Sequence, residues 1–146
     1  MEETNRKILA LLTGDGRMSF TELARKTGLS VSAAQQRVRR MEERGVIRGY
    51  AALIDPQAAG LPLTAFISIK PFDAAAADDA PERLVHLPAI EACHSVAGDE
   101  NYILKVRVAS PAVLEELLQQ IRAAASVSTR TTIVLSTPFE SRPPDV

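Results

Sequence analysis

The segment from Ser30 to Gly45 carries the side chains best suited to chemistry, and that chemistry is recognition of a polyanion. Taken as a helix, it places small and amide side chains early on one face and arginines further along that face. Duplex DNA is recognised in this way, because the first turns of a recognition helix enter the major groove and cations beyond them meet phosphates. The candidate DNA-binding residues are Ser30, Ser32, Ala33, Gln36, Arg37, Arg39 and Arg40.

Two kinds of contact are expected from this face. The Gln36 amide can pair with the edge of an adenine, whereas Arg37 or Arg40 can pair with guanine or with a phosphate. The alternative is that the arginines form only a solvated helix face, as runs of charge usually do. The opposite side of the helix is predicted to pack inward through Val31, Ala34, Val38 and Met41.

Two shorter helices are predicted to precede this segment and to hold it in place. The first follows a capping residue at Thr4 or Asn5 and ends near Gly14. The second begins with a capping box at Ser19–Glu22 and ends at Gly28. A short helix, a tight glycine-containing turn and a longer helix are typical of a helix-turn-helix.

Charge is distributed unevenly along the chain. Residues 1–50 hold ten basic and six acidic side chains, a formal charge of +4, whereas residues 51–146 hold seven and twelve, a formal charge of −5. A basic amino-terminal part fits a module that binds a polyanion. The charge asymmetry, the capping box and the glycine turn together favour DNA binding over a merely solvated face.

Length and composition exclude several other classes of protein. The chain has 146 residues, of which 46% are hydrophobic and 24% charged, as in an ordinary globular protein. It has no run of about 18 apolar residues and no basic-then-apolar start, so we expect a cytoplasmic protein without a membrane span or a secretory signal. Cys93, His86 and His94 make a poor ligand set, and no catalytic motif is found, so no metal site, cofactor or catalytic residue is expected.

The second half of the chain is predicted to alternate strands and helices. Strands are expected at 63–69, 90–96, 102–108 and 129–135, with one helix capped by Asp78 or Asp79 that runs through Val85 and Leu87, and another from 112 to about 124 that packs through Val113. The order βαββαβ is that of a ferredoxin-like unit. Two helices would cover one face of the sheet, and a second copy of the chain is expected to cover the other.

These predictions divide the chain into four segments. The segments are a helix-turn-helix domain at 1–50, a linker at 51–60, a ferredoxin-like domain at 61–137 and a tail at 138–146. Residues 46–54 have β character and are expected to form an extended connector after the helix-turn-helix.

Across nearly its whole length the sequence resembles the Lrp/AsnC, or feast/famine, family of transcriptional regulators. The resemblance rests on Glu22–Ala24, Gly28–Ser30, Arg37–Glu42 and Gly45–Tyr50 in the first half, and on Cys93–Asp99 and Thr129–Thr131 in the second. It implies an α+β fold, in which a winged-type helix-turn-helix is joined by a β linker to a ferredoxin-like domain. It also implies a homodimer assembled through the sheets, often further assembled into octamers, and a small effector, commonly an amino acid, bound between subunits.

The family's Gly-Asp-aromatic-Asp loop would correspond to Gly98–Asn101, and this sequence departs from that pattern at Glu100 and Asn101. A carboxylate of Asp99 or Glu100 could hold an ammonium group, while backbone N–H groups of the loop could bind a carboxylate. The alternative is a simple polar hairpin turn. The candidate effector-binding residues are Gly98, Asp99, Glu100, Asn101, Tyr102, Thr129, Thr131 and Thr132.

Two other functions share parts of this pattern. A chromosome-organising protein that wraps DNA without an effector would use the same DNA-binding residues, and it differs in protecting DNA uniformly rather than at discrete sites. A sirohaem decarboxylase has a similar two-domain architecture and would use His94 and Arg107 in a tetrapyrrole pocket. Such an enzyme would have no need of a basic recognition helix.

Overall fold

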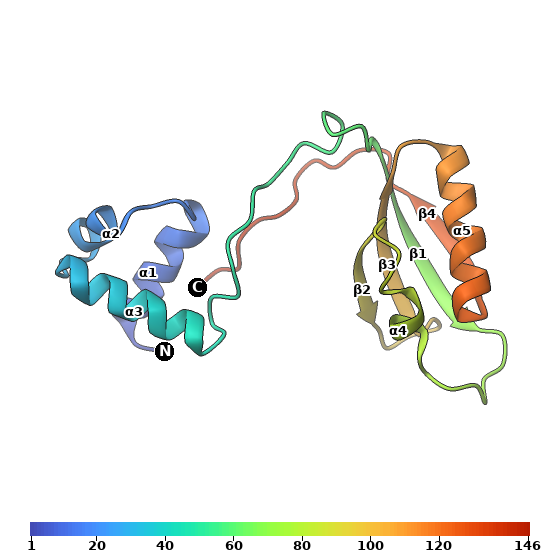
Figure 1. Ribbon diagram of the computed structural model, residues 1–146, viewed down its shortest axis with the longest axis horizontal. Coiled ribbons are helices and arrows are strands. Elements are labelled where there is room, and N and C mark those ends of the chain that lie inside the picture. The colour runs from blue at the N-terminus through green and yellow to red at the C-terminus, as the bar shows by residue number, and fades with distance from the viewer. The chain divides into compact units, whose positions relative to one another are not determined.

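The computed structural model describes all 146 residues and divides the chain into two compact units (Figure 1). One unit comprises Met1–Leu53 and Phe139–Val146, and the other comprises Ile54–Pro138. None of the helices combines the length and the apolar character that a bilayer span requires.

Three helices form the first unit, and their ends follow the local capping chemistry. They are α1 (Glu3–Gly14), α2 (Phe20–Thr27) and α3 (Val31–Glu43). The Ser19 hydroxyl accepts a hydrogen bond from the Glu22 backbone N–H at 3.1 Å and so caps α2 as predicted. Gly28 ends α2 with a φ of 73°, a left-handed conformation that glycine adopts without steric cost.

A small core fixes the inner face of α3. Ile8 and Leu23 are fully buried and pack with α3, which turns its apolar stripe toward them. This leaves the opposite face of α3 open to solvent, as a recognition helix requires. The buried residues of this core are Ile8, Leu9, Leu23, Ala24, Ala34, Val38 and Met41.

Two details of this unit differ from the predictions. α1 begins at Glu3, so Thr4 and Asn5 lie inside its first turn and neither caps it; the Asn5 side chain instead accepts a hydrogen bond from Arg37. Val31 was expected to pack inward but is 46% exposed. It is the first residue of α3, and the buried stripe begins only at Ala34.

The second unit is a four-stranded antiparallel sheet with two helices. The strands follow the order β2-β3-β1-β4 in the sheet. With the chain order βαββαβ this is the predicted ferredoxin-like arrangement. The elements are β1 (Leu63–Pro71), α4 (Ala80–Leu84), β2 (Ile90–Ser95), β3 (Tyr102–Val108), α5 (Pro111–Ala125) and β4 (Val127–Ile133).

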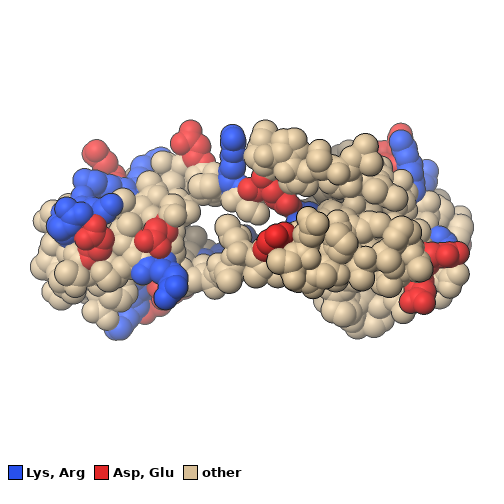
Figure 2. All heavy atoms as spheres, turned by 90° about the horizontal axis from the view of Figure 1, so that it is seen from above, with Lys and Arg blue, Asp and Glu red and all other residues tan.

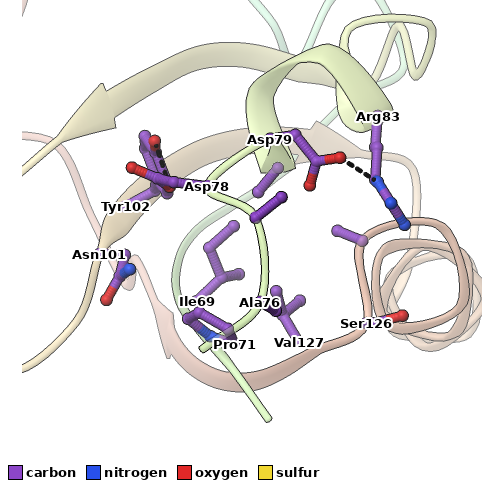
Figure 3. Close-up of a pocket in the computed structure, with 13 residues that line it drawn as sticks. Ile69, Pro71, Ala76, Asp78, Asp79, Arg83, Asn101, Tyr102, Ser126 and Val127 are labelled. Carbon is purple, nitrogen blue, oxygen red and sulfur yellow. Dashed lines mark hydrogen bonds and ion pairs between the residues drawn. The ribbon is translucent and has the colours of Figure 1, made fainter. Parts of the chain in front are cut away.

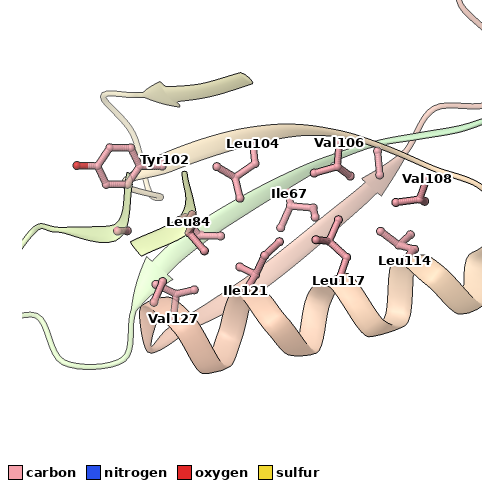
Figure 4. Close-up of a cluster of buried hydrophobic side chains, with 14 residues drawn as sticks. Ile67, Leu84, Tyr102, Leu104, Val106, Val108, Leu114, Leu117, Ile121 and Val127 are labelled. Atoms are coloured by element: carbon pink, nitrogen blue, oxygen red, sulfur yellow. The ribbon is translucent and has the colours of Figure 1, made fainter. Parts of the chain in front are cut away.

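The helices cover one face of this sheet and close its core (Figures 1 and 4). Ile67, Leu104 and Ile121 are fully buried between the central strands and α5. Ser110 precedes α5 and caps it, because its hydroxyl accepts a hydrogen bond from the Val113 backbone N–H, and Pro111 takes the first helical position, which proline favours. On the opposite face of β1, Phe66 is 39% exposed.

Helix α4 is shorter than predicted and has no side-chain cap. It ends at Leu84, and Val85, which was expected to continue it, is 83% exposed. Pro88 disfavours helical geometry in the residue before it, which limits the helix on that side. Neither Asp78 nor Asp79 caps it, because the first accepts a hydrogen bond from Tyr102 and the second from Arg83.

The connector after α3 and the inward face of α5 add two details. Residues 46–54, whose β character predicted an extended connector, form no strand; an extended segment forms a strand only with a partner for its backbone hydrogen bonds. On α5, Leu114 is buried and Val113 is 39% exposed, so the inward face is turned by one residue.

Candidate DNA interface and effector site

Two shallow grooves flank the exposed face of α3, and they differ in chemistry. We call them the polar groove and the cationic groove, each of about 470 Å³. The polar groove is lined by Ser32, Ala33, Gln35, Gln36 and Arg39. The cationic groove is lined by Met1, Glu2, Asn5, Arg37, Arg40, Met41, Arg44 and Val46.

The polar groove has the chemistry of base recognition. The small side chains of Ser32 and Ala33 stand at the start of α3 and allow close approach, while the amides of Gln35 and Gln36 follow one turn later. A side-chain amide can donate to and accept from an adenine edge at the same time. Sequence reasoning missed Gln35, although its position three residues after Ser32 and four before Arg39 places all three in one row of the helix surface.

The cationic groove brings three guanidinium groups to one side of α3. Arg37, Arg40 and Arg44 follow one another at helical spacing along it. The side chains of Arg40 and Arg44 have no ion-pair partner. Basic side chains are prominent on the surface of the first unit, with acidic ones between them (Figure 2).

Arg37 is the exception, because its guanidinium already has partners. Its Nη1 donates to Glu2 Oε2 at 2.9 Å and to Asn5 Oδ1 at 3.1 Å. The hydrogen bond and the charge of Arg37 hold the pKa of the Glu2 carboxyl below its usual value. The Arg37 side chain is therefore drawn toward the start of α1, whereas Gln36 and Arg39 line the other groove.

Ser30 has a structural task at the start of α3. Its hydroxyl accepts a hydrogen bond from the Ala33 backbone N–H at 3.1 Å and lies 3.3 Å from the Ser32 hydroxyl. This cap satisfies a free N–H at the helix start and fixes where the first exposed turn of α3 begins.

The candidate effector loop forms a closed connection between β2 and β3. The Val96 N–H donates to the Asn101 carbonyl, and the Asn101 N–H donates to the Ile69 carbonyl on β1, both at 3.1 Å. The loop is therefore anchored against the sheet at one end, and Asp99 and Glu100 lie within it, just before Asn101.

Part of the predicted effector set lies on an open surface beside this loop, which we call the loop patch. Asp99, Glu100 and Thr129 contribute to it, and the Arg130 guanidinium lies 3.5 Å from the Glu100 carboxylate. Charges of both signs stand beside several hydroxyls, which is the complement of a zwitterion. The loop patch is lined by Ser68, Lys70, Asp99, Glu100, Ser128, Thr129 and Arg130.

Asn101 and Tyr102 belong instead to a small cavity of about 150 Å³, between the ends of β1 and β3 and the start of α4 (Figure 3). The Tyr102 hydroxyl donates to Asp78 Oδ1 at 2.7 Å, and this hydrogen bond raises the pKa of Tyr102 to about 12. Arg83 pairs with Asp79 across 2.9 Å on the same wall. Four of the polar side chains that line this cavity, Asp78, Asp79, Arg83 and Tyr102, thus already bind one another.

The remaining residues predicted to bind the effector line neither the loop patch nor the cavity. Gly98, Thr131 and Thr132 are absent from both linings. Neighbouring side chains of β4 point to opposite faces of the sheet, and the Thr129 hydroxyl accepts a hydrogen bond from Arg122 on α5. The three threonines therefore do not share one face.

Comparison with known proteins identifies the family. Residues 1–48 match the model of a winged helix-turn-helix DNA-binding domain, and residues 64–144 match that of the Lrp/AsnC ligand-binding domain. The HTH-type transcriptional regulator LrpA of Mycobacterium tuberculosis is 51% identical over 97% of this chain and 95% of its own. The chain belongs to the Lrp/AsnC family.

Solved Lrp/AsnC structures agree with this fold over almost the full length. A feast or famine regulatory protein from M. tuberculosis complexed with L-methionine has a TM-score of 0.96 at 51% identity and covers 98% of this chain and 97% of its own. A transcriptional regulator from Neisseria meningitidis, also complexed with L-methionine, has a TM-score of 0.87 at 25% identity, with coverages of 99% and 96%. This Lrp/AsnC chain is a DNA-binding transcriptional regulator.

The residues nominated for a decarboxylase are not brought together in this Lrp/AsnC fold. His94 on β2 pairs with Ile103 on β3. Arg107 lies four residues further along β3, which places it roughly 13 Å along the strand from Ile103. Arg107 is engaged elsewhere, with Glu91 at 2.6 Å and the Thr64 hydroxyl at 3.2 Å.

Proposed function

We propose that this regulator binds specific DNA sites through α3 and that an amino acid, bound at the β2–β3 loop, changes its assembly on DNA. The observation that carries the proposal is the division of α3 between two grooves. The polar groove offers amides and small side chains for base edges, and the cationic groove offers guanidinium groups for phosphates.

The seven residues predicted to bind DNA take different parts in this proposal. Gln36 reads bases, with Gln35 added beside it, and Ser32 and Ala33 allow the approach. Arg39 and Arg40 contact phosphates, Arg37 contacts phosphate after leaving its present partners, and Ser30 holds the start of α3.

The effector is proposed to bind at the loop patch. A free amino acid needs an acceptor for its ammonium group and donors for its carboxylate, and the patch holds Asp99 and Glu100 beside Lys70 and Arg130. The L-methionine complexes of two structural neighbours support this class of ligand. The cavity beneath Tyr102 is the competing location, since its apolar floor could hold a side chain.

A second copy of the chain is the proposed partner of the sheet. The helices leave one face of the sheet without a covering layer, and Phe66 is exposed there. A two-fold dimer would also present two α3 helices to paired half-sites on DNA. The segment boundaries predicted from the sequence, at 50, 60 and 137, stand as the proposed domain limits.

DNase footprinting with the full chain tests the regulatory function. The experiment uses genomic DNA from upstream of the chain's own coding region and compares the pattern of protection with and without L-methionine. Discrete protected sites whose pattern changes with the amino acid are expected. Uniform protection that L-methionine leaves unchanged would instead indicate an effector-independent organiser of DNA.

Thermal-shift measurements locate the effector. A ligand that binds the native state raises the melting temperature, so an amino acid that does so in the wild type is tested on two variants. Glu100→Ala is expected to abolish the shift, and Arg83→Ala, in the cavity, is expected to retain it. The reverse result would move the effector to the cavity.

A further inference from the structure

We infer that the Glu2 carboxylate occupies a phosphate-binding position of the cationic groove, so that Glu2 and the DNA backbone compete for Arg37. The inference rests on the proposed DNA contact of α3 and adds a component of its regulation. It concerns only residues of the first unit, all of which lie around one groove.

The contact has the geometry of a phosphate contact. A carboxylate oxygen accepts from Arg37 Nη1 at 2.9 Å, as a phosphate oxygen would, and Asn5 Oδ1 accepts from the same nitrogen at 3.1 Å. Arginine binds carboxylates and phosphates through the same planar set of N–H donors. Glu2 thus stands where a backbone phosphate would be held.

The surroundings of the pair favour an anion there. Arg40 and Arg44 line the same groove and have no acidic partner, so one carboxylate faces three guanidinium groups. A groove with this excess of cations attracts further negative charge, and the phosphates of duplex DNA supply it at regular spacing.

The pair is also weak enough to be exchanged. The Glu2 side chain is 59% exposed, and it belongs to the residue just before α1 rather than to the packed core. Exposed ion pairs contribute little to stability and are screened by salt. DNA binding can therefore release Glu2 without unfolding α1.

The consequence is that Glu2 lowers DNA affinity in the free chain. Removing its charge should free Arg37 in advance, and the gain should be of the size of an exposed ion pair, about two- to fivefold in affinity. The dependence of the binding constant on salt should change little, because Arg37 contacts a phosphate in both complexes, in the wild type after Glu2 has been displaced.

A double-mutant cycle on the full chain tests this, with fluorescence-anisotropy titrations of a 30-base-pair duplex at several salt concentrations. The variants are Glu2→Gln, Arg37→Gln and the two combined, with Glu3→Gln as the matched control. Glu3 is the adjacent residue with the same charge, but it makes no ion pair. Circular dichroism checks that each variant retains its helices.

We expect Glu2→Gln to bind more tightly than both the wild type and Glu3→Gln, and we expect the combined variant to bind no more tightly than Arg37→Gln alone. If Glu2→Gln equals Glu3→Gln, or if its gain persists without Arg37, the effect is one of net charge and the inference is wrong. If neither the wild type nor any variant binds duplex, the proposed function itself fails.

Discussion

Arg37 and Arg40 stand one turn apart on α3, yet they are prepared for different contacts. Arg40 has no ion-pair partner, while Arg37 is held by Glu2 and Asn5. Helical periodicity places both arginines near the exposed face, because that property is local. The partner of Arg37 lies 35 residues earlier in the chain, and no periodic pattern within α3 can reveal a contact at that distance.

At residue scale, Arg40→Ala should weaken binding to every duplex alike, because a phosphate contact carries no sequence information. The loss of one phosphate contact should lower the log–log salt slope by about 0.9. Arg17→Ala is the control, since it removes the same charge from an exposed residue outside both grooves. Unchanged affinity for Arg40→Ala would contradict the assignment of this side chain.

Gln36→Ala should act differently from Arg40→Ala. It should reduce the preference for a specific site over a random duplex, by about 1–3 kcal/mol if the amide reads one base pair in bidentate fashion. Its affinity for random DNA should stay near that of the wild type. Competition titrations with specific and random duplexes measure both affinities. An equal loss of affinity for the two duplexes would indicate that Gln36 contacts the DNA backbone rather than a base.

The Tyr102–Asp78 hydrogen bond predicts a dependence of stability on alkaline pH. The ordinary pKa of a tyrosine is 10.0, and that of Tyr102 is raised to about 12 in the folded chain. Folding therefore favours the protonated phenol, so this stabilisation is complete below pH 10 and is lost as the pH rises through about 12. Urea unfolding at several pH values should show a smaller alkaline loss for Tyr102→Phe than for the wild type. The same dependence of stability on pH in both proteins would contradict this role of the Tyr102 hydroxyl.

At the scale of elements, the predictable features were those set by neighbouring residues. Ser19, Ser30 and Ser110 each cap the helix that follows, because the hydroxyl needs only the N–H groups of the next turn. Helix α4 starts directly after Asp79, as predicted, but neither Asp78 nor Asp79 bonds to its free N–H groups, because these carboxylates accept hydrogen bonds from Tyr102 and Arg83. The loop patch was predicted only in part, since Lys70, Ser68 and Arg130 come from strands whose pairing brings them to the loop.

The turn between α2 and α3 gives a prediction at this scale. Gly28→Ala would force a side chain into a left-handed conformation, at a cost of about 1–2 kcal/mol, although no atom lies within 4 Å of the added Cβ. Hydrogen exchange should show weaker protection of the α2 and α3 amides by that amount. Gly14→Ala is the control, because Gly14 is helical and has equally open surroundings. An equal loss of protection in the two variants would contradict the claim that the turn requires the left-handed φ of Gly28.

At the scale of the whole molecule, a basic module that binds DNA and an acidic ferredoxin-like module form one regulator. The division in charge was visible in the sequence because it depends only on composition along the chain. The proposed pairing of two copies depends instead on the shape of a sheet face that only the fold assembles. In the proposed dimer, the two α3 helices would bind paired half-sites on DNA.

Phe66→Glu tests the pairing of two copies. A charge placed on the uncovered face of β1 should oppose burial against a second sheet and shift the chain toward monomers. Light scattering after size-exclusion chromatography measures the mass. Val85→Glu is the control, since this side chain is exposed just beyond α4, on the helix-covered side of the sheet. An unchanged mass for Phe66→Glu would place the interface elsewhere.

The central claim is that the exposed face of α3 lies against duplex DNA, and binding of two triple variants tests it most directly. One replaces Arg39, Arg40 and Arg44 by alanine, and the other replaces Lys7, Arg17 and Arg48, so both lose three positive charges within the first unit. We predict that the α3 variant loses nearly all affinity and that its log–log salt slope falls by about three, while the control retains most of its binding. Equal losses in the two variants would contradict the claim.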